Sequence, residues 1–443
     1  MSVLCCNDNG WVIDHQQIVR QWYNNCKIPK SSLLSDTNSL DTKVNKDDIP
    51  NAEERKMSNS EKLTTALQLK SDLFAIKSPY MMDSQFMKLQ KTLETDYIPS
   101  TTSRKRKKKA DKIDEDCVDY TVIKRLSDAH RSLISLAQEK GYLLNKYENI
   151  DNNKSAREAS QIVGPGDSLI DIVETSSTDI VETSSTGKGE TSSTYDNIKP
   201  PLVIEHAQDE VNIHINQLVH FNCDLPTVTQ IFGEKYLLPV NSRFLLSDWS
   251  KLLQTDITDG NGFDLIVIDP PWKNKSVKRK KSYNTVWEDT LLDLPIYQLM
   301  NNGGLVVIWV TNKPKLHSFI KETLLPSWKL KFCVEWHWLK VTTNGELICD
   351  INTTMKKPYE TLIIAQYINN IDNCLPSLPN QQVIISIPCS LHSKKPPLLE
   401  IMKPFLVENP KCLELFARNL QPHWTSWGNE VLKHQHLDYY EVT

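Results

Sequence analysis

The sequence contains no Cys-x-x-Cys pair, although ten cysteines are spread over its 443 residues. This argues against a structural zinc site, and we expect no metal. No Gly-x-Gly-x-x-Gly occurs, so the fingerprint of nicotinamide-binding enzymes is absent. No signal peptide opens the chain and no apolar run approaches about 18 residues, so we expect a soluble, reduced, intracellular protein without membrane contact.

Positive charge is not in excess. The formal net charge is −4, so attraction to nucleic acid must come from local basic patches. Hydrophobic residues make up 39% of the chain, below the level usual for globular proteins. We therefore expect one good core and much sequence that does not contribute to it.

The first 200 residues are predicted to be only partly folded. We divide them into a docking segment at 1–30, a mostly disordered stretch at 31–110, a small helical region at 111–150 and a low-complexity linker at 151–199. The helix prediction comes from apolar residues spaced near 3.6 between 118 and 144. The linker contains three copies of a Ser/Thr-rich hexamer that cannot bury a core.

A run of six basic residues occupies positions 104–109. It suits a nuclear localisation signal, a phosphate-binding arm or simply a solvated loop. Nuclear import is the preferred interpretation, with the cytoplasm as a second location and an added RNA-binding role left open.

From about residue 200 the composition becomes globular. Strand and helix patterns alternate as far as the end of the chain. This alternation predicts one α/β domain at 200–443, with a mostly parallel sheet and helices on both faces. The sheet is expected to be Rossmann-like.

The most informative motif is Asp269-Pro270-Pro271-Trp272, which follows the apolar run 265–268. The run reads as a buried parallel strand, and two prolines end its hydrogen-bonding pattern. In open α/β sheets, ligands bind at the carboxyl ends of the strands. A rigid turn with no chemical role is the simpler alternative.

These residue types suit the handling of an adenine amine, which is a poor nucleophile because its lone pair is delocalised into the ring. The Asp269 carboxylate and the Pro270 carbonyl can both accept hydrogen bonds from the amine and so aim its lone pair at an electrophile. The Trp272 ring can stack on the base, at about 1–3 kcal/mol.

A basic loop follows this motif. Six cations lie between positions 273 and 281, where they could contact phosphates or form a solvated loop. Asn274 would border the target base. The candidate substrate residues here are Asn274, Lys275, Lys278, Arg279, Lys280, Lys281 and Tyr283.

The motif and its surroundings resemble the MT-A70 family, the branch of S-adenosylmethionine-dependent amino-group methyltransferases that makes N6-methyladenine. The matching stretches are 235–239, 244–248, 269–278, 309–312, 335–338, 356–360 and 414–433. They cover the second half of the chain, while the first 200 residues match only weakly. In this family the catalytic strand precedes the cofactor strand.

The resemblance implies S-adenosylmethionine as cofactor. Its contacts, carried over position by position, are Asp248, Asp269, Lys395, Arg418, Asn419, Asn429 and Glu430. Asp248 could instead cap a helix, and the neighbouring Lys394 makes the choice of Lys395 less sharp. Relatives often have Gln where this chain has Glu430. The segment 412–416 is predicted to be a strand, with a helix starting after Gly428.

The resemblance also implies a loop at 356–360 that closes over the substrate, with Lys357 and Tyr359 as candidate contacts. It favours RNA, above all small nuclear RNA, with adenosine or 2′-O-methyladenosine as the target and no obligate protein partner. A DNA N6-adenine methyltransferase, acting on single-stranded or loop DNA, and a catalytically silent RNA-binding partner remain as alternatives.

Overall fold

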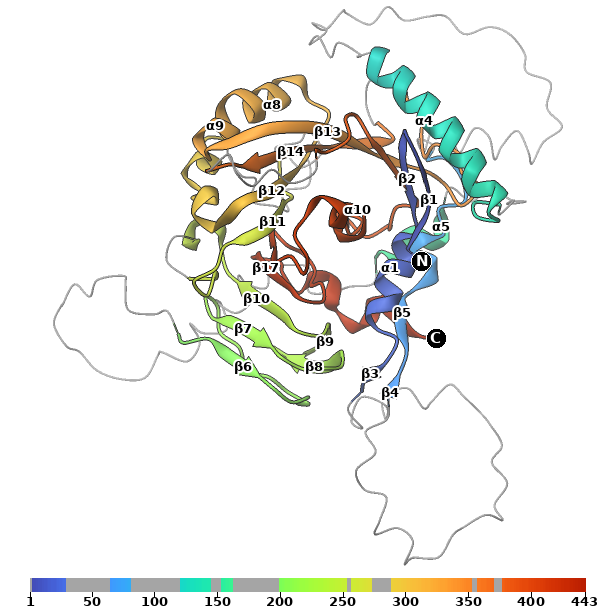
Figure 1. Cartoon of the computed structure of the whole chain (residues 1–443). Coiled ribbons are helices and arrows are strands. Elements are labelled where there is room, and N and C mark those ends of the chain that lie inside the picture. Colours follow the sequence, from blue (N-terminus) through green and yellow to red (C-terminus); the bar gives the residue numbers. More distant parts are fainter. Residues whose placement is uncertain are drawn as a thin grey trace, which may run out of the picture. The chain divides into compact units, whose positions relative to one another are not determined.

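The computed structural model describes residues 2–28, 64–80, 120–144, 153–161, 199–252, 256–272, 288–352, 357–369 and 377–443 (Figure 1). The chain divides into two compact units, each assembled from separate stretches of sequence. Unit 1 consists of Met1–His15, Ser71–Gln161 and Leu305–Val407, and unit 2 of Gln16–Lys70, Ile162–Gly304 and Glu408–Thr443.

The main sheet of unit 2 has the strand order β11-β16-β17-β10-β7-β6 among the described residues. Their bounds are β6 (Leu202–Ile204), β7 (Leu218–Phe221), β10 (Ser242–Leu246), β11 (Phe263–Ile268), β16 (Cys412–Leu415) and β17 (Trp424–Gly428). The four from β11 to β10 are parallel, while β7 runs antiparallel to β10. Strand β11 is buried at every position except Asp264, as its apolar sequence predicts.

The register of these parallel strands aligns their carboxyl ends. Ile268 of β11 pairs with Leu415 of β16, and Leu415 pairs with Trp427 of β17. Leu246 of β10 pairs with Gly428, the last residue of β17. The residues that follow these four strands therefore emerge along one edge of the unit 2 sheet.

Segments from the start of the chain complete unit 2. A second sheet has the order β4-β3-β8-β9, and β5 pairs with β18. Their bounds are β3 (Cys26–Lys27), β4 (Thr64–Thr65), β5 (Leu67–Leu69), β8 (Thr227–Ile231), β9 (Glu234–Leu238) and β18 (Tyr440–Val442). Helix α1 (His15–Trp22) precedes β3. The stretch 31–110, predicted to be mostly disordered, thus contains paired strands.

Short helical turns connect the unit 2 strands. They are η3 (Trp249–Lys251), η4 (Glu288–Asp293), η5 (Ile296–Leu299), η8 (Lys433–Gln435) and η9 (Leu437–Tyr439). The helix predicted to start after Gly428 was wrong, because the chain forms turns there and then the 3-10 helix η8. The backbone N–H of His434 donates to the Arg418 carbonyl at 2.8 Å, which an α-helix would not allow.

Unit 1 contains six strands in the order β1-β2-β15-β13-β14-β12. Their bounds are β1 (Val3–Asn7), β2 (Gly10–Ile13), β12 (Met300–Val310), β13 (Leu330–Lys340), β14 (Tyr359–Tyr367) and β15 (Val383–Ser386). Strand β14 is antiparallel to both β12 and β13, whereas β15 is parallel to β13 and β2. The α/β class is confirmed. Pairing in the unit 1 sheet is mixed, whereas parallel pairs predominate in the unit 2 sheet.

The docking segment at 1–30 joins the unit 1 sheet through Gly10. Gly10 has φ 141° and pairs with Val383 of β15. A Cβ at this position would lie 1.9 Å from the Val383 carbonyl oxygen, so only glycine permits the pairing.

Helix α4 (Tyr120–Glu139) is the long helix predicted near 118–144. It packs against β1, β2 and β15 in one apolar cluster with Leu126, Leu133 and Leu339 (Figure 1). Gly141, at φ 80°, follows its last turn. This helix therefore belongs to the core of unit 1.

The other helices of unit 1 are short. They are η2 (Ser71–Phe74), α5 (Lys154–Ala159), α8 (Pro314–Phe319), the π-helical turn η6 (Ile320–Leu324), α9 (Leu325–Ser327), α10 (Leu399–Met402) and η7 (Lys403–Phe405). Helix α5 lies within the predicted linker 151–199 and buries Ala156 and Ala159. Within the described ranges, no helix is long and apolar enough to cross a membrane.

Candidate functional site

Asp269 is the first residue beyond β11, at the aligned sheet edge of unit 2. Its backbone N–H donates to the Leu415 carbonyl at 3.4 Å, so the chain leaves the sheet only after Asp269. The Trp272 N–H then donates to the Pro270 carbonyl at 2.8 Å and closes a tight turn. A carbonyl oxygen has two lone pairs, so this bond uses half of the Pro270 accepting capacity.

Arg418 links the Asp269 carboxylate to Glu430. Its Nη1 lies 3.5 Å from Asp269 Oδ2, and its Nε donates to Glu430 Oε2 at 3.1 Å. Lys433 Nζ contacts the other Glu430 oxygen at 2.5 Å. Since each of the Asp269, Arg418 and Glu430 side chains is less than 15% exposed, these charges interact with limited screening. The structure therefore brings three predicted site residues into one ionic chain.

Asn419 lies next to this chain but has a different contact. Its Nδ2 donates to Glu414 Oε2 at 3.2 Å, and Gln421 Nε2 donates to the same oxygen at 3.1 Å. Glu414 is thus a partly buried carboxylate with two amide partners. It fixes the turn that carries Arg418 and Asn419.

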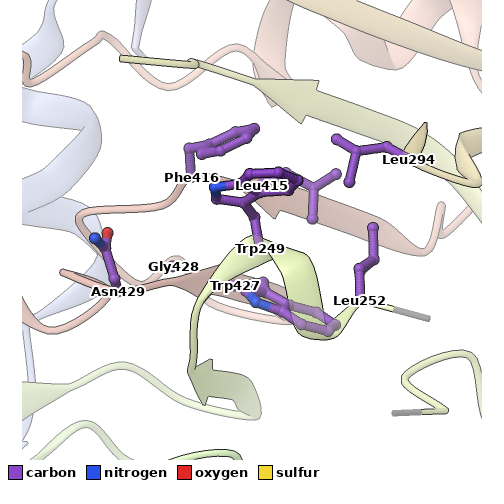
Figure 2. A pocket seen from close by; sticks show the side chains of 8 residues that line it. All are labelled: Trp249, Leu252, Leu294, Leu415, Phe416, Trp427, Gly428 and Asn429. Carbon is purple, nitrogen blue, oxygen red and sulfur yellow. The ribbon is translucent and has the colours of Figure 1, made fainter. Parts of the chain in front are cut away.

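An open pocket lies at the same edge of unit 2, and the empty space in it, open solvent included, is about 300 Å³. Its lining residues are Trp249, Leu252, Leu294, Leu415, Phe416, Trp427, Gly428 and Asn429. Figure 2 shows that the three aromatic side chains come from different parts of the fold: η3, the end of β16 and β17. Phe416 has φ 59°, a strained conformation for an aromatic residue that is typical of ligand sites.

Asp248 caps η3, whose first residue, Trp249, lines the pocket. Its Oδ1 accepts a hydrogen bond from the Ser250 N–H at 2.9 Å, which is the capping role left open above. Asn429, another predicted cofactor residue, lines the pocket and is exposed. Two predicted cofactor residues thus lie at or beside the pocket.

Lys395 belongs to a charged cluster in unit 1. Its Nζ lies 3.2 Å from Glu360 Oε2, and Lys340 contacts the other oxygen of Glu360. The Lys395 ammonium lies 5.6 Å from the ring centroid of Trp309, and the Lys340 ammonium lies 4.4 Å from that of Trp338. Burial alone would raise the pKa of Glu360, but Lys340 and Lys395 lower it to about 2.

The remaining candidates of unit 1 flank this cluster. Lys357 Nζ donates to the Ile351 carbonyl at 3.2 Å. Tyr359 is half-buried against the α4 cluster, and its ring packs against that of His337. Because alternate strand residues face opposite sides, Tyr359 and Glu360 point to opposite faces of β14.

Seven candidate substrate residues, Asn274, Lys275, Lys278, Arg279, Lys280, Lys281 and Tyr283, lie outside the described residues, as does the basic run 104–109. The aromatic walls of the pocket were not predicted. Trp249 directly follows Asp248, and Phe416 directly precedes the turn with Arg418, so closeness to predicted residues was the available signal. No group of three potential metal ligands occurs in the part of the chain that the structure describes.

Residues 263–430, from the first residue of β11 to Glu430, match the MT-A70 family model. The chain therefore contains an MT-A70 domain. The matched region contains the Asp269 turn and the ionic chain as far as Glu430. It also contains Glu414 with its two amide partners, and Glu360 with its two lysines. Helix α4 and the strands β1 to β5 lie outside it.

Three relatives show what the chain is similar to. The mouse N(6)-adenine-specific methyltransferase METTL4 is 45% identical over 51% of the chain and 49% of its own length. The N6-methyladenosine RNA methyltransferase MTA1 of Pyricularia oryzae is 37% identical over 48% of the chain and 60% of its own length. The DNA N6-methyl methyltransferase of Caenorhabditis elegans is 29% identical over 84% of the chain and 92% of its own length. The chain thus spans about half of the mouse protein.

Proposed function

We propose that the chain is an S-adenosylmethionine-dependent N6-adenine methyltransferase that acts on RNA. Small nuclear RNA is the substrate class that we favour, with adenosine or 2′-O-methyladenosine as the target. The observation that carries the proposal is the position of Asp269. It follows β11 at the same edge as the end of β16, where Leu415 and Phe416 line an aromatic pocket.

The pocket suits the adenosine half of the cofactor. Flat walls from Trp249 and Phe416 match a purine, and a glycine and the polar Asn429 complete the lining. Asp248 offers its carboxylate to the adenine amine, and Asn429 and Glu430 offer oxygens for ribose hydroxyls. Bound in this way, S-adenosylmethionine supplies a methyl group that its sulfonium makes electrophilic.

The chain's own residues mainly provide positioning. Asp269 and the Pro270 carbonyl accept from the target amine and aim its lone pair, and Asp269 is placed to take the released proton. Trp272 is only 6% exposed, and we assign its ring to hold the base beside the two acceptors. The loop 273–283 is assigned to the phosphates.

RNA is preferred to DNA for two reasons. A base in a duplex must be extruded at a cost of a few kcal/mol, which a single-stranded or loop nucleotide largely avoids. The fungal relative, at 37% identity, is named for RNA, whereas the nematode relative, at 29%, is named for DNA. We further propose a nuclear location and activity without an obligate protein partner.

The test is methyl transfer from isotopically labelled S-adenosylmethionine to matched RNA and DNA oligonucleotides, followed by mass spectrometry of the nucleosides. We expect labelled N6-methyladenosine, formed faster in RNA. Equal or faster transfer to DNA would overturn the RNA assignment. If transfer to both is absent and calorimetry finds no cofactor binding, the chain is a silent RNA-binding partner.

A further inference from the structure

Helix α4 lies outside the matched MT-A70 region, yet it reaches a strand inside it. Arg125 of α4 donates from Nη2 to His337 Nδ1 of β13 at 2.9 Å. Because a guanidinium can only donate, Nδ1 must be the acceptor, and the neutral ring carries its proton on Nε2. His337 is 2% exposed, so this contact lies inside unit 1.

His337 in turn contacts Tyr359, the first residue of β14. In the β13–β14 register, His337 is opposite Thr361 and Leu339 is opposite Tyr359, so His337 and Tyr359 are diagonal neighbours on one face. Their ring centroids are 5.5 Å apart with an interplanar angle of 61°. Tyr359 also packs against the apolar cluster that contains Leu126 of α4.

Burial and the surrounding cations keep the His337 ring neutral, against the opposing effect of Glu335. Arg125 faces it from α4, Glu335 lies 4.0 Å from Nε2 on β13, and His317 and Lys321 approach from α8 and η6. Burial, followed by the charge of Arg125, lowers the pKa of His337 to about 3. The ring therefore remains an acceptor for Arg125 throughout the physiological pH range.

Other N-terminal segments of unit 1 hold the connection that leads to β14. His130 of α4 contacts the Gly345 carbonyl through Nε2 at 2.8 Å. The backbone N–H groups of Thr343 and Tyr80 donate to the carbonyls of Ile76 and Ile348 at 2.8 and 2.6 Å, respectively. The connection is thus fixed at three points by residues from outside the matched region.

We propose that α4 is a positioning element for the start of β14, and that Arg125 is the residue through which it acts. It holds Tyr359 through His337. Tyr359 immediately precedes Glu360, which pairs with Lys395. This inference rests on the proposed function, and it takes Lys357 and Tyr359 as the substrate contacts that the family resemblance implies.

The test compares Arg125→Ala with Arg131→Ala. Arg131 lies on the same helix, but its side chain is 78% exposed and pairs with Asp128. With a single-stranded, adenosine-containing RNA oligonucleotide, Arg125→Ala should raise KM about 10-fold relative to Arg131→Ala, with kcat within about 2-fold. Arg125→Lys should recover part of the loss, because lysine can still donate one hydrogen bond to Nδ1.

A second measurement does not depend on activity. NMR titration of histidine-labelled protein should show that Arg125→Ala raises the pKa of His337, because a neighbouring positive charge is removed, whereas Arg131→Ala leaves it unchanged. An unchanged pKa in Arg125→Ala would overturn the contact itself.

Equal KM values for the two alanine variants would overturn the positioning role even if the pKa of His337 moves. If the wild-type chain methylates nothing, the proposed function fails. Fluorescence anisotropy with the same oligonucleotide then decides about Arg125: weaker binding by Arg125→Ala than by Arg131→Ala supports the proposal, and equal binding overturns it.

Discussion

Two charged clusters, one around Glu360 in unit 1 and one around Arg418 in unit 2, are built in opposite ways. In unit 1, one carboxylate, Glu360, is shared by the two cations Lys340 and Lys395. In unit 2, one cation, Arg418, is shared by the two carboxylates of Asp269 and Glu430. The Glu360 arrangement commits a carboxylate to its partners, as its pKa of about 2 shows. The Arg418 arrangement divides a cation, and the 3.5 Å contact to Asp269 is the longer of the two.

This contrast indicates which carboxylate can leave its ion pair and bind a ligand at a small cost in free energy. When a partly buried carboxylate turns away from two close cations, the loss of both ion pairs costs several kcal/mol, roughly 3–5 for a buried pair. Asp269 lies at a sheet edge beside a pocket wall, and Arg418 keeps Glu430 as a second partner if Asp269 turns to a substrate amine. We therefore expect substitutions in unit 2 to affect chemistry and substitutions in unit 1 to affect stability first.

The largest expected effect is on catalysis. Asp269→Ala should lower methyl transfer about 1000-fold, because the amine loses its anionic acceptor, while the cofactor dissociation constant stays within a few fold. The matched control is Asp264→Ala on the same strand, since Asp264 accepts from the Asn301 side chain and the Lys411 backbone, each at 2.8 Å. It should lower stability and retain transfer. An equal loss of cofactor binding in Asp269→Ala would show that the division of roles is wrong.

In unit 1 the expected loss is one of stability. Glu360→Ala leaves Lys340 and Lys395 partly buried without their carboxylate and should lower the free energy of unfolding by about 3 kcal/mol. Urea unfolding measures this, with Glu400→Ala as the control because its pair with Lys403 is exposed. The control should change stability by less than about 0.5 kcal/mol. Similar losses in both variants would erase the difference between the two arrangements.

The pH dependence follows from the same cluster and from Glu335. Burial alone would raise the pKa of Glu335, but hydrogen bonds from His317 and Lys321 lower it to about 2, as Lys340 and Lys395 do for Glu360. Both folded pKa values are below the usual 4.5, so the stabilisation is present above pH 4.5 and lost as the pH falls toward 2.

At pH 3 each carboxylate should have lost about 2 kcal/mol of stabilisation. Glu360→Gln should therefore remove about half of this decline, as measured by urea unfolding at pH 5 and pH 3. An undiminished decline in Glu360→Gln would assign the acid sensitivity to other groups.

The buried strands of this fold could be predicted from the sequence, because runs of apolar residues are a local signal. The run 265–268 became β11, and 412–416 became β16 with one residue fewer. Helix α4 could also be predicted, because its apolar residues recur about every 3.6 positions. The order of the strands could not be predicted. Gly10 pairs with Val383, for example, and nothing in the local sequence of either segment indicates its partner.

The candidate site divides along the same line. Asp269 could be singled out because its motif is contiguous, and its place at a strand end followed from the preceding apolar run. Its contact with Arg418 depends on the β11–β16 register, which periodicity does not specify. The same holds for Arg125 and His337, which meet only because α4 packs on the unit 1 sheet.

The smallest expected effect concerns the outer end of the unit 2 chain. Lys433 is 31% exposed and contacts Glu430, so Lys433→Met removes the most exposed ion pair of the ionic chain. The cofactor dissociation constant should rise about 2-fold to 5-fold, as calorimetry would show. In a Glu430→Gln background, Lys433 has lost its charged partner. Adding Lys433→Met to that variant should therefore leave the cofactor dissociation constant unchanged. Additive losses would instead mean that Lys433 acts on the cofactor site independently of Glu430, and the ionic chain would end at Glu430.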